Sequence, residues 1–191
     1  MVITNLNTWI YFGLIQIILI LGLFWSIKGN LSKYSRYVFG LVLGLFLVHV
    51  GASILLLYLA VKKSPLSTYL LSGKDSFFVG RLENIGVSVG SVLLLAVVLY
   101  LLSRILIKRQ KRQFLEEEFP LIVAVIVIIA GLSNIIPVIF LALVSGIFYQ
   151  VLTKNRNSIS LIPFLLTSMI IINTLNIFPF YREILSRLHL L

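Results

Sequence analysis

The chain is dominated by apolar runs of about twenty residues, separated by short loops that carry Lys and Arg. An α-helix rises about 1.5 Å per residue, so about 20 apolar residues cross the hydrocarbon core of a bilayer, which is about 30 Å thick. Four such runs cover residues 9–27, 38–61, 86–107 and 158–178. The sequence therefore predicts an all-α, multi-pass integral membrane protein, folded as a single membrane-embedded domain over residues 1–191.

A fifth apolar stretch, residues 120–152, is too long for one ordinary span, because as a continuous helix it would measure about 50 Å. Near its middle it carries Gly131, Asn134 and Pro137, which are residue types that break or kink helices. We favour two short helices that meet at a tight turn, which gives six membrane segments. One long, kinked and tilted helix would give five.

Composition excludes several classes of function. Hydrophobic residues make up 60% of the chain and charged residues 12%, against about 45–50% and about 25% in an average soluble domain. Cysteine is absent, histidine occurs twice and Asp and Glu together six times. Most catalytic and metal-binding constellations need more such residues, so we expect no enzyme activity, no cofactor and no metal.

The net charge of +10 lies mainly in the short loops. This placement indicates topology signals and contact with anionic lipid headgroups, and not a nucleic-acid partner. No Lys or Arg precedes the first run, whereas Lys28, Lys33 and Arg36 follow it. The positive-inside rule then predicts an outside N-terminus. We expect the chain to lie in the plasma membrane. With six segments and with five, ten basic residues lie inside and six outside, so the charge distribution does not distinguish the two topologies.

His49 is the only ionisable side chain, tyrosines apart, well inside a predicted span. Such a residue is a functional candidate by default. The spans supply no second histidine or acid for a haem site or a proton relay, so we favour a neutral imidazole bonded to a neighbouring helix. Ser53 lies four residues further on and shares the same helix face.

Amides mark two other places where a solute path or a polar helix contact could form. Asn134 and Pro137 lie at the break in the fifth stretch, and discontinuous helices often build sites at the membrane midplane. Asn173 and Asn176 are three residues apart and share one face of the last span. The candidate transport or packing site therefore comprises His49, Ser53, Asn134, Pro137, Asn173 and Asn176.

Glycines provide candidate faces for close helix packing. Gly40, Gly44 and Gly51 fall on one face of the second span, opposite His49, and Gly86 and Gly90 repeat the small-xxx-small spacing in the third. At the C-terminus, residues 180–191 place Ile184, Leu185, Leu188 and Leu191 at helical spacing among polar residues. This pattern predicts an amphipathic helix in the membrane interface.

Two functions fit these features. The first is a non-catalytic subunit of a larger membrane complex, with other membrane protein subunits and the lipid bilayer as partners. The alternative is a small transporter, or the membrane-embedded substrate-binding component of one, with its site at the broken helix around Asn134 and Pro137. A membrane enzyme fits worst, because no pair of acid, base or nucleophile lies within the spans.

Overall fold

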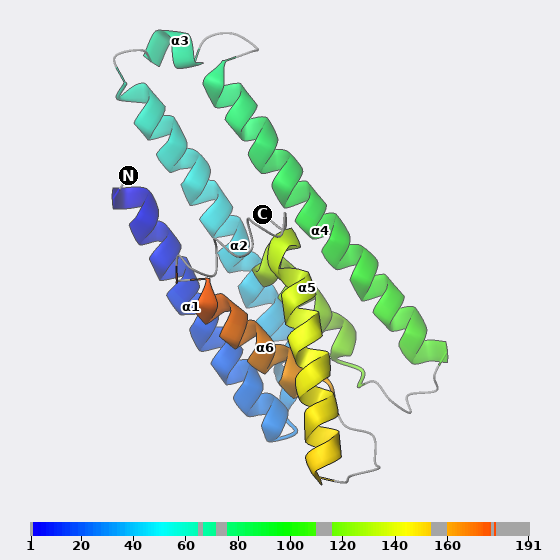
Figure 1. Ribbon diagram of the computed structural model, residues 1–191. Helices are drawn as coiled ribbons and strands as arrows, with labels where there is room; N and C mark the ends of the chain where they lie inside the picture. The colour runs from blue at the N-terminus through cyan, green and yellow to red at the C-terminus, as the bar shows by residue number, and fades with distance from the viewer. Residues whose placement is uncertain are drawn as a thin grey trace.

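The computed structural model describes residues 2–64, 67–71, 76–109, 116–153, 160–176 and 178. The helices run in the order α1 (Val2–Ile27), α2 (Leu31–Lys62), α3 (Ser67–Leu71), α4 (Phe77–Arg109), α5 (Phe119–Thr153) and α6 (Ile162–Leu175) (Figure 1). No strand occurs among the described residues. The all-α prediction is thus confirmed, whereas the amphipathic helix predicted over 180–191 lies outside the described residues.

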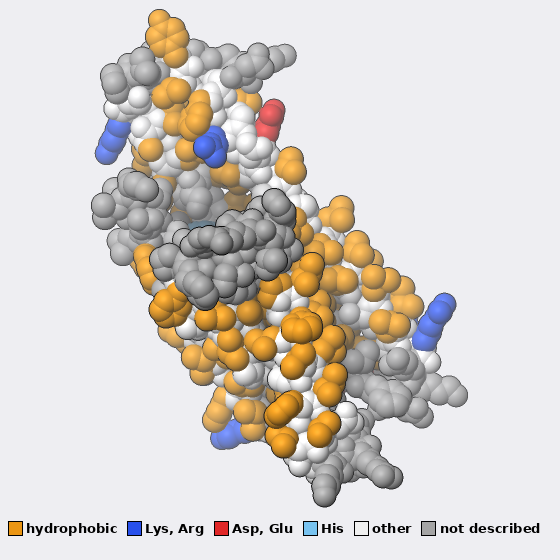
Figure 2. Space-filling model, in the orientation of Figure 1, with side chains coloured by type: hydrophobic (Ala, Val, Ile, Leu, Met, Phe, Trp, Pro, Cys, Tyr) orange, Lys and Arg blue, Asp and Glu red, His pale blue; other side chains and the backbone are white. Residues whose placement is uncertain are grey.

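Four of these helices are long and apolar enough to cross a membrane: Thr8–Ile27, Lys33–Lys62, Phe77–Arg109 and Phe119–Thr153. Their flanks are covered by apolar side chains, with charged side chains at the ends of the molecule (Figure 2). Val48 and Leu94, for example, are 68% and 67% exposed. Water would solvate such a surface poorly, whereas lipid acyl chains are as apolar as these residues, so the surface suits a bilayer.

Helix α4 begins at Phe77, well before the predicted start of the third span at residue 86. The Ser76 hydroxyl accepts a hydrogen bond from the Val79 backbone N–H at 3.3 Å, as a helix N-cap does. Arg81 and Glu83, whose charges lie before the predicted apolar run, therefore belong to the first two turns of α4. The segment between α2 and α4 includes the short helix α3.

Helix α5 contains a sharp bend at Gly131, whose φ of 65° and ψ of −172° are not helical. Only glycine adopts this combination readily, because a Cβ atom would clash with the backbone. The two halves then run side by side, because both line one apolar cavity of about 180 Å³. The lining residues that α5 contributes are Phe119, Val123 and Ile126 before the bend and Ile135, Ile139, Ala142 and Leu143 after it. Thus α5 is an antiparallel helical hairpin, and its two ends lie toward the same end of the bundle (Figure 1).

The two short helices favoured from the sequence are therefore present, but the position predicted for the break needs a correction. The chain reverses at Gly131, and Asn134 and Pro137 lie within the second helix of the hairpin. The reversal needs a positive φ, which proline cannot adopt and asparagine adopts with strain. Pro137 keeps a helical φ and sits in the helix interior.

The first half of the α5 hairpin forms the centre of the bundle. Its residues Ile122, Val125 and Val127 are fully buried. Helix α5 packs against α4, α6 and α2, whereas α2 and α4 make little direct contact with each other. Helix α6 packs between α5 and α1. The hairpin therefore separates α2 from α4.

Replacement of Gly131 by alanine tests the bend. Nothing else in the structure lies within 4 Å of a Cβ atom built at Gly131, so the cost comes from strain in the local backbone and not from a contact with another helix. We expect Gly131→Ala to reduce the free energy of unfolding by about 1–3 kcal/mol, measured by thermal unfolding in a neutral detergent. Gly13→Ala is the matched control, because Gly13 is helical and its added Cβ also meets nothing within 4 Å. Equal stability of the two variants would contradict the strained bend.

Candidate functional site

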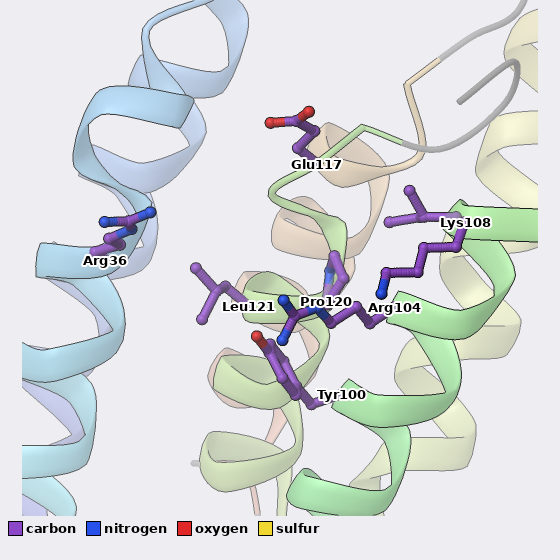
Figure 3. Close-up of a pocket in the computed structure, with 8 residues that line it drawn as sticks. Arg36, Tyr100, Arg104, Lys108, Glu117, Pro120 and Leu121 are labelled. Carbon is purple, nitrogen blue, oxygen red and sulfur yellow. The ribbon is translucent and has the colours of Figure 1, made fainter. Parts of the chain in front are cut away.

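Two hollows lie between α2 and α4, one near each end of the bundle. The lower hollow, at the end where α1 joins α2, has a volume of about 840 Å³ (Figure 3). Helix α2 contributes one lining residue, and α4 and the start of α5 contribute the others. These residues are Arg36, Tyr100, Arg104, Ile107, Lys108, Glu117, Pro120 and Leu121.

The upper hollow is a groove of about 570 Å³ near α3. Its lining residues are Ser53, Leu56, Leu57 and Ala60 from α2 and Phe77, Arg81, Asn84, Ile85, Ser88 and Val89 from α4. Ser53 donates its hydroxyl proton to the backbone carbonyl of His49 at 2.8 Å, so its donor is already used within α2. Among the described lining residues, Arg81 alone is charged, and the others offer hydroxyl, amide and apolar groups.

The first half of the α5 hairpin, residues 119–130, lies between these two hollows. Its buried side chains are all apolar, and they include Ile122, Val125, Ile126 and Ile128. The surface that this helix buries between α2 and α4 is therefore apolar. The arrangement has two openings toward opposite ends of the bundle and an apolar barrier between them.

The two hollows differ in electrostatics. Among the described residues that line the lower hollow, Arg36, Arg104 and Lys108 carry three positive charges and Glu117 carries one negative charge, a net charge of +2. Sequence reasoning assigned the basic residues of the short loops to membrane topology. Only the folding of α5 between α2 and α4 brings these four residues around one cavity, so no local signal in the sequence could have revealed this grouping.

His49 lies between α1 and α2. Its ring stacks on Tyr11, with the two ring centroids 4.2 Å apart and an angle of 20° between the ring planes. Offset or stacked ring pairs of this kind stabilise helix contacts by about 0.5–1.5 kcal/mol. His49 therefore packs between the two helices. That it has no role beyond packing stays a prediction.

A polar contact between α1 and α6 was not singled out from the sequence. The side-chain amide of Gln16 donates to the Thr174 hydroxyl at 3.0 Å and to the Ile170 carbonyl at 3.3 Å. Thr174 also donates to the Ile170 carbonyl at 2.8 Å. The available signal was Gln16 itself, as one of the few strongly polar residues of the first apolar run.

The predicted amides lie apart from the two hollows. Asn173 is buried in α6, and its Nδ2 atom has no hydrogen-bond partner among the described residues. Asn176 is the C-terminal cap of α6, and its backbone N–H donates to the Ile172 carbonyl at 3.0 Å. Asn134 and Pro137 are half-buried just after the bend of α5 and line neither hollow. The predicted site residues therefore do not form one cluster around the hollows. Of these six residues, only Ser53 lines a hollow.

The predicted packing glycines face outward. No atom lies within 4 Å of a Cβ built at Gly40, Gly44, Gly51, Gly86 or Gly90. Helix α2 buries its opposite face, with Val38 and Val42, against the rest of the bundle. These glycines therefore mediate no close helix packing within the described chain, and a role in contact with another chain stays a prediction.

Within the described ranges, no group of three or more His, Cys, Asp and Glu residues is placed to hold a metal ion. Comparison with protein-family models, with curated proteins and with solved structures gives no match for this chain. The functional conclusion therefore rests on the geometry and chemistry of its own residues.

The contact between Gln16 and Thr174 leads to a stability prediction. Thr174→Val removes the hydroxyl that Gln16 bonds, and we expect it to lower the free energy of unfolding by about 1 kcal/mol. Thr167→Val is the matched control, because Thr167 is exposed on the same helix. Thermal unfolding in detergent measures both. If Thr167→Val lowered the free energy of unfolding as much as Thr174→Val, that result would contradict a specific contact between α1 and α6.

Proposed function

We propose that this chain is a non-catalytic membrane transport protein whose passage runs between α2 and α4, with the α5 hairpin as its gate. The observation that carries the proposal is the position of the hairpin, whose apolar first half lies between two hollows formed by the same pair of helices. This is the transporter predicted as an alternative from the sequence. Its passage, however, flanks the hairpin and is not centred on Asn134 and Pro137.

The hairpin itself supports a transport function. A non-helical backbone at membrane depth is tolerated only inside protein or beside water, because lipid offers no hydrogen-bond partners. Helices interrupted in this way are common in transporters, where they form substrate sites near the midplane. A small displacement of residues 119–130 would connect the upper and lower hollows, which is the movement that a gate requires.

The membrane topology that we propose has the N-terminus outside and both ends of α5 on the inner side. Residues 119–130 rise only about 18 Å, which is less than the hydrocarbon core of about 30 Å, so the first half of the hairpin enters the membrane without crossing it. This keeps the sides that the six-segment scheme assigns, with the two halves of α5 forming one re-entrant hairpin. The lower end of the bundle carries Lys33, Arg36, Arg104 and Lys108, as the positive-inside rule expects of the inner side.

The second candidate is the non-catalytic subunit of a membrane complex. The outward glycines of α2 and α4 support it, since small residues allow another helix to approach closely. In that case a partner helix or lipid would occupy the upper hollow, and water would not enter it. Water access to the two hollows therefore distinguishes the two functions.

The absence of native cysteine allows this test with single-cysteine variants and a membrane-impermeant thiol reagent in sealed vesicles. We expect Ser88→Cys, in the upper hollow, to react only from the outside, and Tyr100→Cys, in the lower hollow, only from the inside. Val127→Cys, in the buried part of the hairpin, should not react from either side. Leu94→Cys is the control, because Leu94 is 67% exposed but lines neither hollow and should face lipid.

No reaction at Ser88→Cys, together with stoichiometric partner proteins after purification in mild detergent, would contradict the transporter and support the subunit. Reaction of Leu94→Cys as fast as that of Ser88→Cys would show that the flank of α4 faces water, which would contradict the passage between α2 and α4.

A further inference from the structure

We propose that the lower hollow is a binding site for a phosphate group, and that this phosphate belongs to the headgroup of an anionic lipid. The proposal goes beyond the transport function and does not depend on it, since a bundle that conducts nothing could still bind a phosphate there. It rests on the grouping of cations around one cavity that the α5 hairpin creates.

The first argument is electrostatic. Arg36 from α2 and Arg104 and Lys108 from α4 face the same cavity of about 840 Å³ (Figure 3). All three side chains are exposed, so the argument rests on their opening toward one shared cavity, where an anion can meet all of them. Glu117 offsets only one of the three charges. A bound anion with one or two negative charges would balance the remaining +2, and a phosphate group carries that charge.

The second argument is the type of donor. A guanidinium group presents paired N–H donors that match two oxygens of one phosphate, and the cavity has two guanidinium groups on opposite walls. The ammonium group of Lys108 and the Tyr100 hydroxyl can add further hydrogen bonds. A carboxylate has only two oxygens to share among these donors, whereas a phosphate group offers three or four.

The start of α5 leaves the direct bonds to the side chains of α2 and α4. Pro120, in the first turn of the α5 helix, lines the cavity. The Phe119 and Ile122 N–H groups already donate to the Glu116 and Glu118 carbonyls at 3.1 Å. The negative charges of Glu116, Glu117 and Glu118 offset the partial positive charge of this helix N-terminus.

The surroundings favour a lipid as the source of the phosphate. Ile107, Pro120 and Leu121 add an apolar wall beside the cations. The cavity lies near the ends of α2 and α4, where headgroups meet acyl chains. Basic pockets between membrane helices at this depth are typical sites for anionic headgroups. The volume lies within the usual range of ligand pockets, about 300–1,000 Å³.

The test uses the full chain purified in a neutral detergent, titrated separately with short-chain phosphatidic acid and with inorganic phosphate. Calorimetry measures the affinity of the wild type and of the variants Arg36→Gln and Arg104→Gln. Arg109→Gln is the matched control, because Arg109 lies at the same end of α4, is exposed and does not line the cavity. All variants remove one positive charge, so the comparison separates the site from general surface charge.

We expect phosphatidic acid to bind, and each cavity variant to weaken its binding at least about tenfold, which is typical of a lost charged hydrogen bond. Arg109→Gln should change it less than about twofold, because Arg109 does not line the cavity, although it is exposed like Arg36 and Arg104. If inorganic phosphate binds as tightly and with the same dependence on Arg36 and Arg104, the phosphate site stands but a soluble compound supplies the phosphate. Equal losses in all three variants, or no loss in any, would overturn the site.

Discussion

Hydrogen bonding of the backbone inside the membrane is the constraint on which the rest of this structure depends. Helix α5 reverses at Gly131, and the reversal leaves backbone groups that lipid cannot bond. The hairpin must therefore be enclosed by protein, and its first half lies between α2 and α4, with α6 on its other side. Its fully buried aliphatic residues make it the centre of the hydrophobic core, although its sequence alone resembles a lipid-facing span.

The separation of α2 from α4 follows from this arrangement, and so do the two hollows. The hairpin fills the space between these helices over only part of their length, which leaves the groove near α3 at one end and the basic cavity at the other. One structural element therefore accounts for the apolar barrier, for both openings and for the grouping of Arg36 with Arg104. The proposed gate and the proposed phosphate site lie at different parts of the same hairpin, its middle and its start.

Several features of this fold could be predicted from the sequence, because the length of an apolar run and the rise of a helix suffice to identify membrane segments. The turn within α5 was also predictable from its length, but its position at Gly131, and not at Asn134 or Pro137, depends on a backbone conformation that composition does not reveal. The early start of α4 depends on the Ser76 cap, which the charges of Arg81 and Glu83 obscured. The basic cavity could not be predicted, because its residues are far apart in sequence and meet only through the hairpin.

The distance between the two arms of the hairpin tests the central claim most directly. Spin labels at Glu118→Cys and Val144→Cys would flank the bend, and Val144 is exposed enough to carry a label. Packed antiparallel helices lie about 8–10 Å apart. Double electron–electron resonance on the protein in lipid should therefore give a distance between the two spin labels below about 25 Å, once the label arms are included. A single straight or gently kinked helix would separate these positions by about 39 Å. A distance near that value would contradict the hairpin, and with it the two hollows that the function requires.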